Sequence, residues 1–474
     1  MPAMILERFE DPGLSQYSYA VGCAAAGVVA VVDPRRDVEV YLEWARGRGV
    51  RIVKVLETHV HADFASGARE LASRAGAELL LSAHDEGERY EVAFPHRELR
   101  DGDVVELGKV RLVALHTPGH TPEHLSFLVY DGARSADVPA ALLSGDFLFV
   151  GSVGRPDLLG EEAKSALARE LFRSVRDKLG PLPDGLEVHP GHGAGSMCGA
   201  GMSARPFSTL GFERAANPYL APSGEQAFVD RLLAGAPPFP DYYRRMKELN
   251  AAGPPALPPP LGEPLAPAAF ARLAADGQHV VIDVRDRLAF GGGHVPGALG
   301  IGTDDSLSTW AGWVVPPDRP LLLVADGAEQ AEEARLALAR VGLDRVAGWL
   351  AGMKGWIAAG LQVATLPQVS VHALHALREG HGAAGGAAPR VLDVRSAAEY
   401  RQGHVAGAVH VPAGELATRL DELPAGPVAV VCGGGYRSTV AASVLQRAGR
   451  DEVVNVAGGM GAWKRAGLPV VEGD

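Results

Sequence analysis

Residues 58–64, THVHADF, decide how the first half of the chain folds. They follow RIVKVLE, which is predicted to form a strand. His59, His61 and Asp63 alternate with small or apolar residues, so an extended or tightly turned backbone projects their side chains to one side. This arrangement predicts a metal site at a strand end, whereas a polar, solvent-facing loop is the alternative for this stretch alone.

Three further stretches repeat the pattern of a polar residue after an apolar run. TPGHTPEH, LLSGDFLF and VHPGHG place His120, Asp146 and His192 in this way. A lone carboxylate buried without a partner would be costly, so Asp146 needs a cation beside it. Four such positions in one domain predict that it binds a metal.

The bulk composition narrows the class of protein. The chain has 474 residues, 47% hydrophobic and 22% charged, with a formal charge of -12. Well-mixed charge argues against nucleic acid or a membrane surface as partner. The N-terminal segment lacks a signal-like apolar run, which predicts a cytoplasmic protein. The three cysteines Cys23, Cys198 and Cys432 are odd in number and far apart, so no disulfide framework is expected, and Cys23 is expected in a core.

A proline-rich linker, AAGPPALPPPLGEP, is predicted at residues 251–264 and ends a first domain at residues 1–250. An internal repeat follows. VVIDVRDRLAFGGGHVPGALGI aligns with RVLDVRSAAEYRQGHVAGAVHV, which predicts two related domains at residues 265–366 and 367–474. Apolar strands alternate with alanine-rich helices in each copy, so both are expected to be α/β domains with doubly wound parallel sheets.

The last domain carries a candidate nucleophile. Cys432 begins the six-residue loop CGGGYR, which ends at Arg437 before a helix. Inward-pointing amides, the helix N-terminus and the guanidinium all favour an anion, so we expect a lowered pKa for the Cys432 thiol and a persulfide held on its sulfur. The loop residues expected to bind the substrate anion are Gly433, Gly434, Gly435 and Tyr436. A buried structural cysteine is the alternative.

The middle copy lacks this nucleophile. Ala325 stands opposite Cys432 when LLLVADGAEQ is aligned on VAVVCGGGYR, and residues 199–431 contain no cysteine. Thiolate chemistry is therefore excluded there. The domain is interpreted as a spacer, a docking surface or a dimer contact.

The order HxHxD, PGH, GD and PGH resembles the metallo-β-lactamase superfamily over residues 1 to about 245. The resemblance implies an αββα sandwich with a metal at one sheet edge. Two-metal members similar to glyoxalase II have histidine where this chain has Phe64, which removes a nitrogen ligand from the second site. The resemblance therefore favours one metal.

Within that superfamily the chain most resembles the persulfide dioxygenases, which implies one Fe(II) per chain held by His59, His120 and Asp146. Two histidines and one carboxylate leave positions open for a persulfide and dioxygen, although zinc on the same ligands could activate water. The remaining polar residues of the motifs are expected to orient the ligands or bond to metal-bound water. They are His61, Asp63 and His192, with His61 the first candidate for a further ligand.

The same resemblance suggests substrate groups. GSVGRPDLLG places Arg155 where the family has an arginine near the substrate. The segment that begins GHGAGSMCGAG is similar to bacterial fusions of such a dioxygenase with rhodanese domains, and makes Cys198 a candidate catalytic thiol for sulfane sulfur, or else a small buried residue. Ala194 stands where glutathione-using members have tyrosine, which puts glutathione persulfide in doubt.

Residues 368–474 resemble rhodanese, and a loop of six residues favours sulfur over the phosphate chemistry of related, longer loops. The combined prediction is an iron-dependent persulfide dioxygenase fused to an inactive and an active rhodanese domain, acting in sulfide detoxification. It would take a low-molecular-weight thiol persulfide and dioxygen and give sulfite, thiosulfate or both, with oligomeric state left open. The alternatives are a zinc-dependent thioesterase or glyoxalase II-like hydrolase, and a sulfur carrier with a vestigial first site.

Overall fold

The structure, a computed structural model, describes residues 4–221, 224–235, 238–304, 306–380, 388–423 and 425–473. The chain divides into two compact units. The first comprises the residues up to Leu257 together with Ala339–Gly342, and the second comprises the rest. Within the described residues, no helix has the length and apolar character that a membrane span requires.

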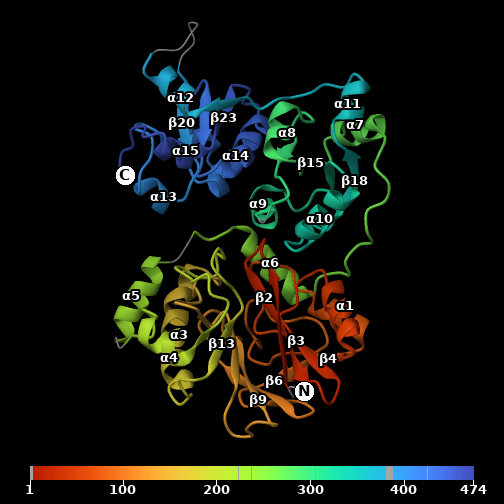
Figure 1. Cartoon of the computed structure of the whole chain (residues 1–474), viewed down its shortest axis with the longest axis vertical. Coiled ribbons are helices and arrows are strands. Elements are labelled where there is room, and N and C mark those ends of the chain that lie inside the picture. Colours follow the sequence, from red (N-terminus) through yellow and green to blue (C-terminus); the bar gives the residue numbers. More distant parts are fainter. Residues whose placement is uncertain are drawn as a thin grey trace. The chain divides into compact units, whose positions relative to one another are not determined.

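Two six-stranded sheets form the centre of the first unit (Figure 1). The first sheet has the order β1 (Met4–Asp11), β2 (Gln16–Cys23), β3 (Val28–Val32), β4 (Arg51–Leu56), β5 (Glu78–Ser82) and β6 (Arg97–Leu99). The second has the order β14 (Ser208–Thr209), β13 (Glu187–Pro190), β10 (Ala141–Gly145), β9 (Leu125–Asp131), β8 (Val110–His116) and β7 (Val104–Leu107). A short hairpin pairs β11 (Leu148–Phe149) with β12 (Ser152–Val153).

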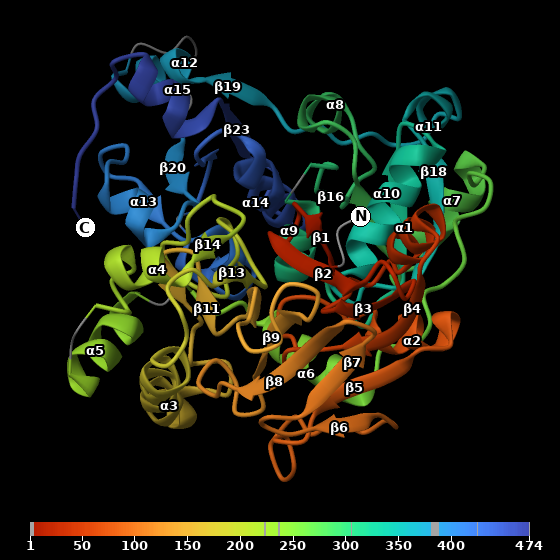
Figure 2. The same ribbon diagram turned by 60° about the horizontal axis from the view of Figure 1, so that its bottom comes forward.

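The main core of this unit lies between the two sheets, where apolar side chains of β2 to β6 meet those of β7 to β10. Helices α1 (Glu39–Arg48) and α2 (Ala68–Ala75) cover the outer face of the first sheet. Helices α3 (Glu161–Leu179), α4 (Leu210–Ala216) and α5 (Glu225–Gly235) lie on the outer side of the second. Figure 2 shows α2 and α3 outside their respective sheets. The expected αββα sandwich is confirmed.

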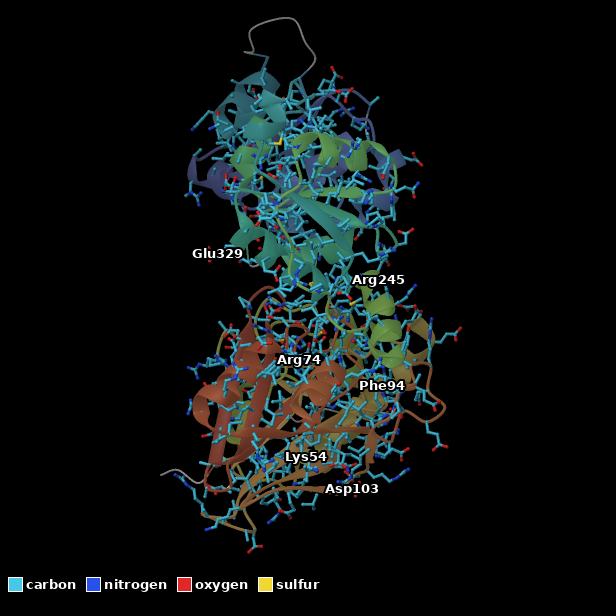
Figure 3. All side chains as sticks on the ribbon, turned by 90° about the vertical axis from the view of Figure 1, so that its right-hand side faces the viewer. Lys54, Arg74, Phe94, Asp103, Arg245 and Glu329 are labelled. Atoms are coloured by element: carbon cyan, nitrogen blue, oxygen red, sulfur yellow. The ribbon has the colours of Figure 1, made fainter. Side chains whose placement is uncertain are left out.

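Helix α6 (Tyr242–Ala252) ends this unit. The segment between β5 and β6, marked by Phe94 in Figure 3, is tied to the end of α6 because the Ala93 N–H donates to the Ala251 carbonyl at 2.9 Å. Asp103, also labelled, lies between β6 and β7 and bonds the Arg100 N–H at 2.8 Å.

The second unit contains two parallel sheets, as the repeat predicted. One has the order β16 (Leu299–Gly300), β15 (Val280–Asp283), β17 (Leu321–Ala325) and β18 (Val346–Ala351). Its helices are α7 (Pro267–Ala275), α8 (Arg287–Gly292), α9 (Leu307–Val314), α10 (Ala328–Ala339) and α11 (Lys354–Ala358). The other sheet has the order β19 (Gln368–Ser370), β23 (Val453–Ala457), β22 (Val428–Val431), β20 (Arg390–Asp393) and β21 (Val409–His410). Around it lie α12 (Val371–Arg378), α13 (Ala397–Arg401), α14 (Tyr436–Arg447), α15 (Gly459–Arg465) and the 3-10 turns η1 (Ala413–Thr418) and η2 (Leu420–Glu422).

The DVR motifs of the two copies have the same structural role. Arg285 Nε and Nη2 donate to the two oxygens of Asp283 at 2.9 and 2.6 Å. Arg395 repeats this pairing on Asp393, also at 2.9 and 2.6 Å. All four side chains are buried, and a buried bidentate pair needs both members because either charge alone would be costly. The repeated motif therefore has a structural role that the two domains share.

Candidate functional site

Three predicted ligands meet at one end of the sandwich. His59 follows β4, His120 lies between β8 and β9, and Asp146 follows β10. Asp146 Oδ2 lies 3.4 Å from His120 Nε2 and 3.9 Å from His59 Nε2. Donors bonded to one metal ion at roughly 2.0–2.2 Å lie about 3–4 Å apart, so this spacing fits a single ion.

The converging atoms have no other partner. His59 Nε2, His120 Nε2 and Asp146 Oδ2 are buried and form no hydrogen bond with the described residues. A buried polar atom left unpaired is costly, and three that face one another are explained by a cation between them. The residues therefore fit a bound metal.

Neighbouring groups fix both imidazoles in the form that binds a cation. The Thr58 hydroxyl donates to Asp33 at 2.9 Å and so accepts from His59 Nδ1, also at 2.9 Å. His120 Nδ1 donates to the Arg155 carbonyl at 2.8 Å. These bonds leave the lone pair on each Nε2.

Burial and neighbouring imidazoles also keep these rings neutral. Burial, with His61 and His120 nearby, holds the pKa of His59 well below its usual value. Burial and the neighbouring His124 likewise lower the pKa of His120. Neutral imidazole is the form that ligates metals.

His192 and Asp63 lie beside the third ligand. His192 Nδ1 donates to Asp146 Oδ1 at 2.8 Å, and its Nε2 donates to Asp63 Oδ2 at 2.7 Å. Burial opposes protonation, but the Asp146 and Asp63 carboxylates raise the pKa of His192 to about 10. The ring thus holds the Asp146 carboxylate in place, and its role in orienting a metal ligand stays a prediction.

His61 contacts carboxylates other than Asp146. Its Nε2 donates to Asp33 Oδ1 at 3.2 Å and lies 3.3 Å from Glu57 Oε2. The Phe64 ring packs against the imidazole with ring centroids 4.3 Å apart. The apolar residue at position 64 therefore supports the orientation of His61.

Cys198 is buried near the same cluster. Donor atoms of Asp63, His192 and Cys198 all lie within 4.8 Å of one another. Burial, together with the Asp63 and Asp146 carboxylates, raises the pKa of the Cys198 thiol well above its usual value. Its role as a catalytic thiol stays a prediction.

The Arg155 guanidinium is bonded to other groups of the protein. The side chain is 1% exposed, and Nε and Nη2 donate to both oxygens of Asp157 at 2.6 and 2.7 Å. Nη1 donates to the Met197 and Pro238 carbonyls at 2.9 and 3.3 Å. Binding of a substrate anion by this guanidinium stays a prediction, and it would require these partners to be displaced.

Sequence reasoning missed the groups that hold the ligand loops. The Thr58 hydroxyl bonds both the candidate ligand His59 and the Asp33 carboxylate. The His124 ring accepts the Asp146 N–H at 3.0 Å. Asp33 follows the apolar run VVAVV, the signal that identified the other strand-end residues.

Helix α6 supplies two more missed groups. Asn250 Nδ2 donates to the His61 and Phe64 carbonyls at 2.8 and 2.7 Å, and its Oδ1 accepts the Ser66 N–H at 2.8 Å. Lys247, fully buried, donates to the Val60 carbonyl at 3.0 Å. Nothing in the local sequence of α6 marks these residues as part of the site.

Replacing Asn250 by alanine is expected to loosen the loop of residues 58–66, which carries the candidate ligand His59. The change leaves three buried backbone groups unpaired, so it should lower the free energy of unfolding by about 1–3 kcal/mol and lower metal occupancy as well. Asn217→Ala is the matched control, because this buried asparagine also makes three hydrogen bonds, to Ser152, Glu213 and Tyr219. Urea unfolding and metal analysis should show stability lost in both variants but metal lost only in Asn250→Ala. Equal metal content in both would contradict this role.

In the second unit, Cys432 follows β22 and is 1% exposed. Its Sγ accepts the Gly435 N–H at 3.0 Å and lies 3.3 Å from Ser438 Oγ. Gly435 has a φ of 106°, which favours glycine at this loop position. The loop thus directs at least one backbone donor onto the sulfur.

The other predicted loop residues have definite partners. Arg437 donates to both oxygens of Glu399 at 2.7 Å each. The Tyr436 hydroxyl donates to the Gly302 carbonyl at 3.0 Å. Anion binding by Gly433 and Gly434 stays a prediction.

The strand register of the two domains supports the alignment of Ala325 with Cys432. Val324 pairs with Asp283 on neighbouring strands, as Val431 pairs with Asp393. Ala325 therefore occupies the place of Cys432.

Comparisons with known proteins identify the families of the domains. Residues 11–192 match the family described as the metallo-beta-lactamase superfamily. Residues 266–359 and 371–466 each match the rhodanese-like domain.

The similar proteins include both hydrolases and an oxygenase. The chain is 34% identical to a hydroxyacylglutathione hydrolase of Polaromonas sp. strain JS666, over 40% of this chain and 66% of that protein. It is 27% identical to the mitochondrial persulfide dioxygenase ETHE1 of Bos taurus, over 48% of this chain and 79% of that one. The crystal structure of a metallo-beta-lactamase from Staphylococcus aureus subsp. aureus COL has a TM-score of 0.65 and 34% identity, covering 73% of this chain and 99% of that one.

Proposed function

We propose a function from one premise: the chain belongs to the metallo-β-lactamase superfamily and joins a domain of that fold to two rhodanese-like domains. The proposed activity is oxidation of a low-molecular-weight persulfide by dioxygen, coupled to sulfur transfer by Cys432. In the first step RSSH, dioxygen and water give RSH and sulfurous acid, which ionises to sulfite.

His59, His120 and Asp146 would hold the metal, which we propose to be one Fe(II). Bound iron supplies the redox chemistry by which dioxygen oxidises sulfur, and two histidines with one carboxylate are the donor set typical of such oxygenases. The chain's own contribution is to fix both rings through Thr58 and the Arg155 carbonyl, and the carboxylate through His192.

One observation carries the choice of a single metal. Beside Asp146, the residues that could bind a second ion are bonded to each other, since His192 donates to Asp63 at 2.7 Å. The residue after Asp63 is Phe64, which offers no metal ligand. Phe64 packs on His61, which is held by Asp33 and Glu57. These contacts support a single ion.

Sulfur transfer is assigned to the last domain. The Cys432 thiolate attacks the outer sulfur of RSSH, the S–S bond breaks, and RS⁻ leaves with the bonding pair. The Gly435 N–H, which already points at Sγ, stabilises the anionic sulfur. Transfer of this sulfur to sulfite would release thiosulfate.

An oxygen electrode tests the proposal. With glutathione, cysteine or coenzyme A persulfide in turn, the purified chain should consume one dioxygen for each sulfite or thiosulfate formed. Product formation that continues under strict anaerobiosis would contradict an oxygenase.

A hydrolase is the second candidate, favoured by the 34% identity to a hydroxyacylglutathione hydrolase. Asp63, His192 and Cys198 could then bind a second ion beside Asp146. A zinc-loaded chain that hydrolyses an acyl-glutathione thioester, without oxygen uptake on persulfides, would support this candidate.

A further inference from the structure

The middle domain lies against the Cys432 loop, although it has no thiol of its own. The Tyr436 hydroxyl at the start of α14 donates to the Gly302 carbonyl at 3.0 Å, and Arg447 at its end donates to the Gly297 carbonyl at 3.0 Å. Helix α14 lies beside β16 of the middle domain (Figure 2). One wall of the sulfur site is therefore built by the cysteine-less copy.

Arg287 brings a positive charge to this wall. It lies in α8, and a Cβ placed on Gly435 would be 3.8 Å from its Nε. Gly435 is also the residue whose N–H points at the Cys432 sulfur. Arg287 is exposed and forms no ion pair or hydrogen bond with the part of the chain that the structure describes.

Arg437, the cation of the Cys432 loop itself, is already paired with a carboxylate. Arg437 donates from Nη1 and Nη2 to both oxygens of Glu399. Burial works against ionisation of this carboxyl, yet bonding to Arg437 lowers the pKa of Glu399 to about 2. The pair is thus neutral overall near pH 7. Asp304 of the middle domain acts on the Tyr436 hydroxyl, whose pKa is raised by burial and by this carboxylate.

We propose that the middle domain completes the sulfur-transfer site and that Arg287 binds an anionic sulfur oxyanion, sulfite, at the mouth of the Cys432 loop. This inference rests on the proposed sulfur transfer at Cys432. It gives the cysteine-less domain a binding role in the site, where the sequence left only spacing, docking or dimerisation.

The acceptor step needs such a charge because both reactants are anions. The sulfur lone pair of sulfite attacks the outer sulfur of the Cys432 persulfide. The S–S bond breaks, its electron pair returns to Cys432 as thiolate, and thiosulfate leaves. A guanidinium beside Gly435 offsets the repulsion between the two negative groups and orients the oxygens of sulfite.

The test compares two acceptors on the full chain under anaerobic conditions, with one persulfide donor throughout. Sulfite is the anionic acceptor and dithiothreitol the neutral one. R287Q should lower kcat/KM for sulfite roughly tenfold, as expected for loss of a charge-assisted hydrogen bond, and leave dithiothreitol within twofold. R287K should restore part of the sulfite rate. R272Q is the matched control, since Arg272 is an exposed arginine of α7 in the same domain, and it should change neither rate.

The outcomes separate this inference from the proposed function. If wild-type protein transfers sulfur to neither acceptor, the assignment of Cys432 itself fails. If wild-type protein is active and R287Q keeps the same preference for sulfite over dithiothreitol, Arg287 does not bind the anion. An equal loss with both acceptors would also overturn the inference, because it would indicate a structural effect.

Discussion

Replacing Asp146 by alanine should abolish both metal binding and persulfide-dependent oxygen uptake. The change removes the carboxylate oxygen that faces His59 and His120, and also the partner of His192. Changes to groups that only support a ligand already cost about 10–100-fold, so loss of a ligand should lower oxygen uptake by at least roughly 100-fold. Metal analysis and an oxygen electrode measure the two effects.

His120→Ala should behave in the same way, which guards against a folding defect peculiar to one variant. The matched control is His189→Ala, because this imidazole lies on β13, bonds Glu187 at 3.1 Å and packs against the rings of Tyr19 and Phe207. Its circular dichroism, metal content and oxygen uptake should equal those of the unchanged chain. Oxygen uptake that survives in Asp146→Ala would contradict the metal centre.

Replacing Cys432 by serine should remove thiosulfate from the products and leave oxygen uptake within about twofold. Serine keeps the size of the side chain but cannot hold a sulfane sulfur, so thiosulfate above the uncatalysed background should fall by at least roughly 100-fold. Sulfite should accumulate instead. Ion chromatography of the products distinguishes the two anions.

Cys23→Ala is the matched control for this change. Cys23 is buried in the core between the two sheets of the first unit. Removing its thiol should leave the ratio of sulfite to thiosulfate unchanged. An unchanged thiosulfate yield in Cys432→Ser would contradict the proposed division of labour.

The candidate ligands could be picked out in the sequence because each of them follows a predicted strand within four residues. His59 follows β4 of the first sheet and Asp146 follows β10 of the second, so the two sheets bring them together at one end of the sandwich. The DVR repeat was equally legible, since a buried Asp–Arg pair constrains both residues two positions apart.

The supporting groups could not be read in this way. Asn250 and Phe64 are 186 positions apart, and their contact depends on how α6 packs against the loop of residues 58–66. Arg155 is predicted to bind substrate, and in the structure its guanidinium bonds to Asp157, two residues away. The substrate role stays a prediction. Arg287 has no local signal at all, because its position beside Gly435 arises from the packing of two domains. Tertiary contacts, which local patterns do not encode, decide these roles.

Metal analysis of the chain, purified without added metal from cells supplied with both iron and zinc, tests the mononuclear centre most directly. The account predicts one iron per chain, lost in Asp146→Ala, with oxygen uptake in proportion to iron content. Two metal ions per chain, or zinc in a form that turns over without oxygen, would contradict it.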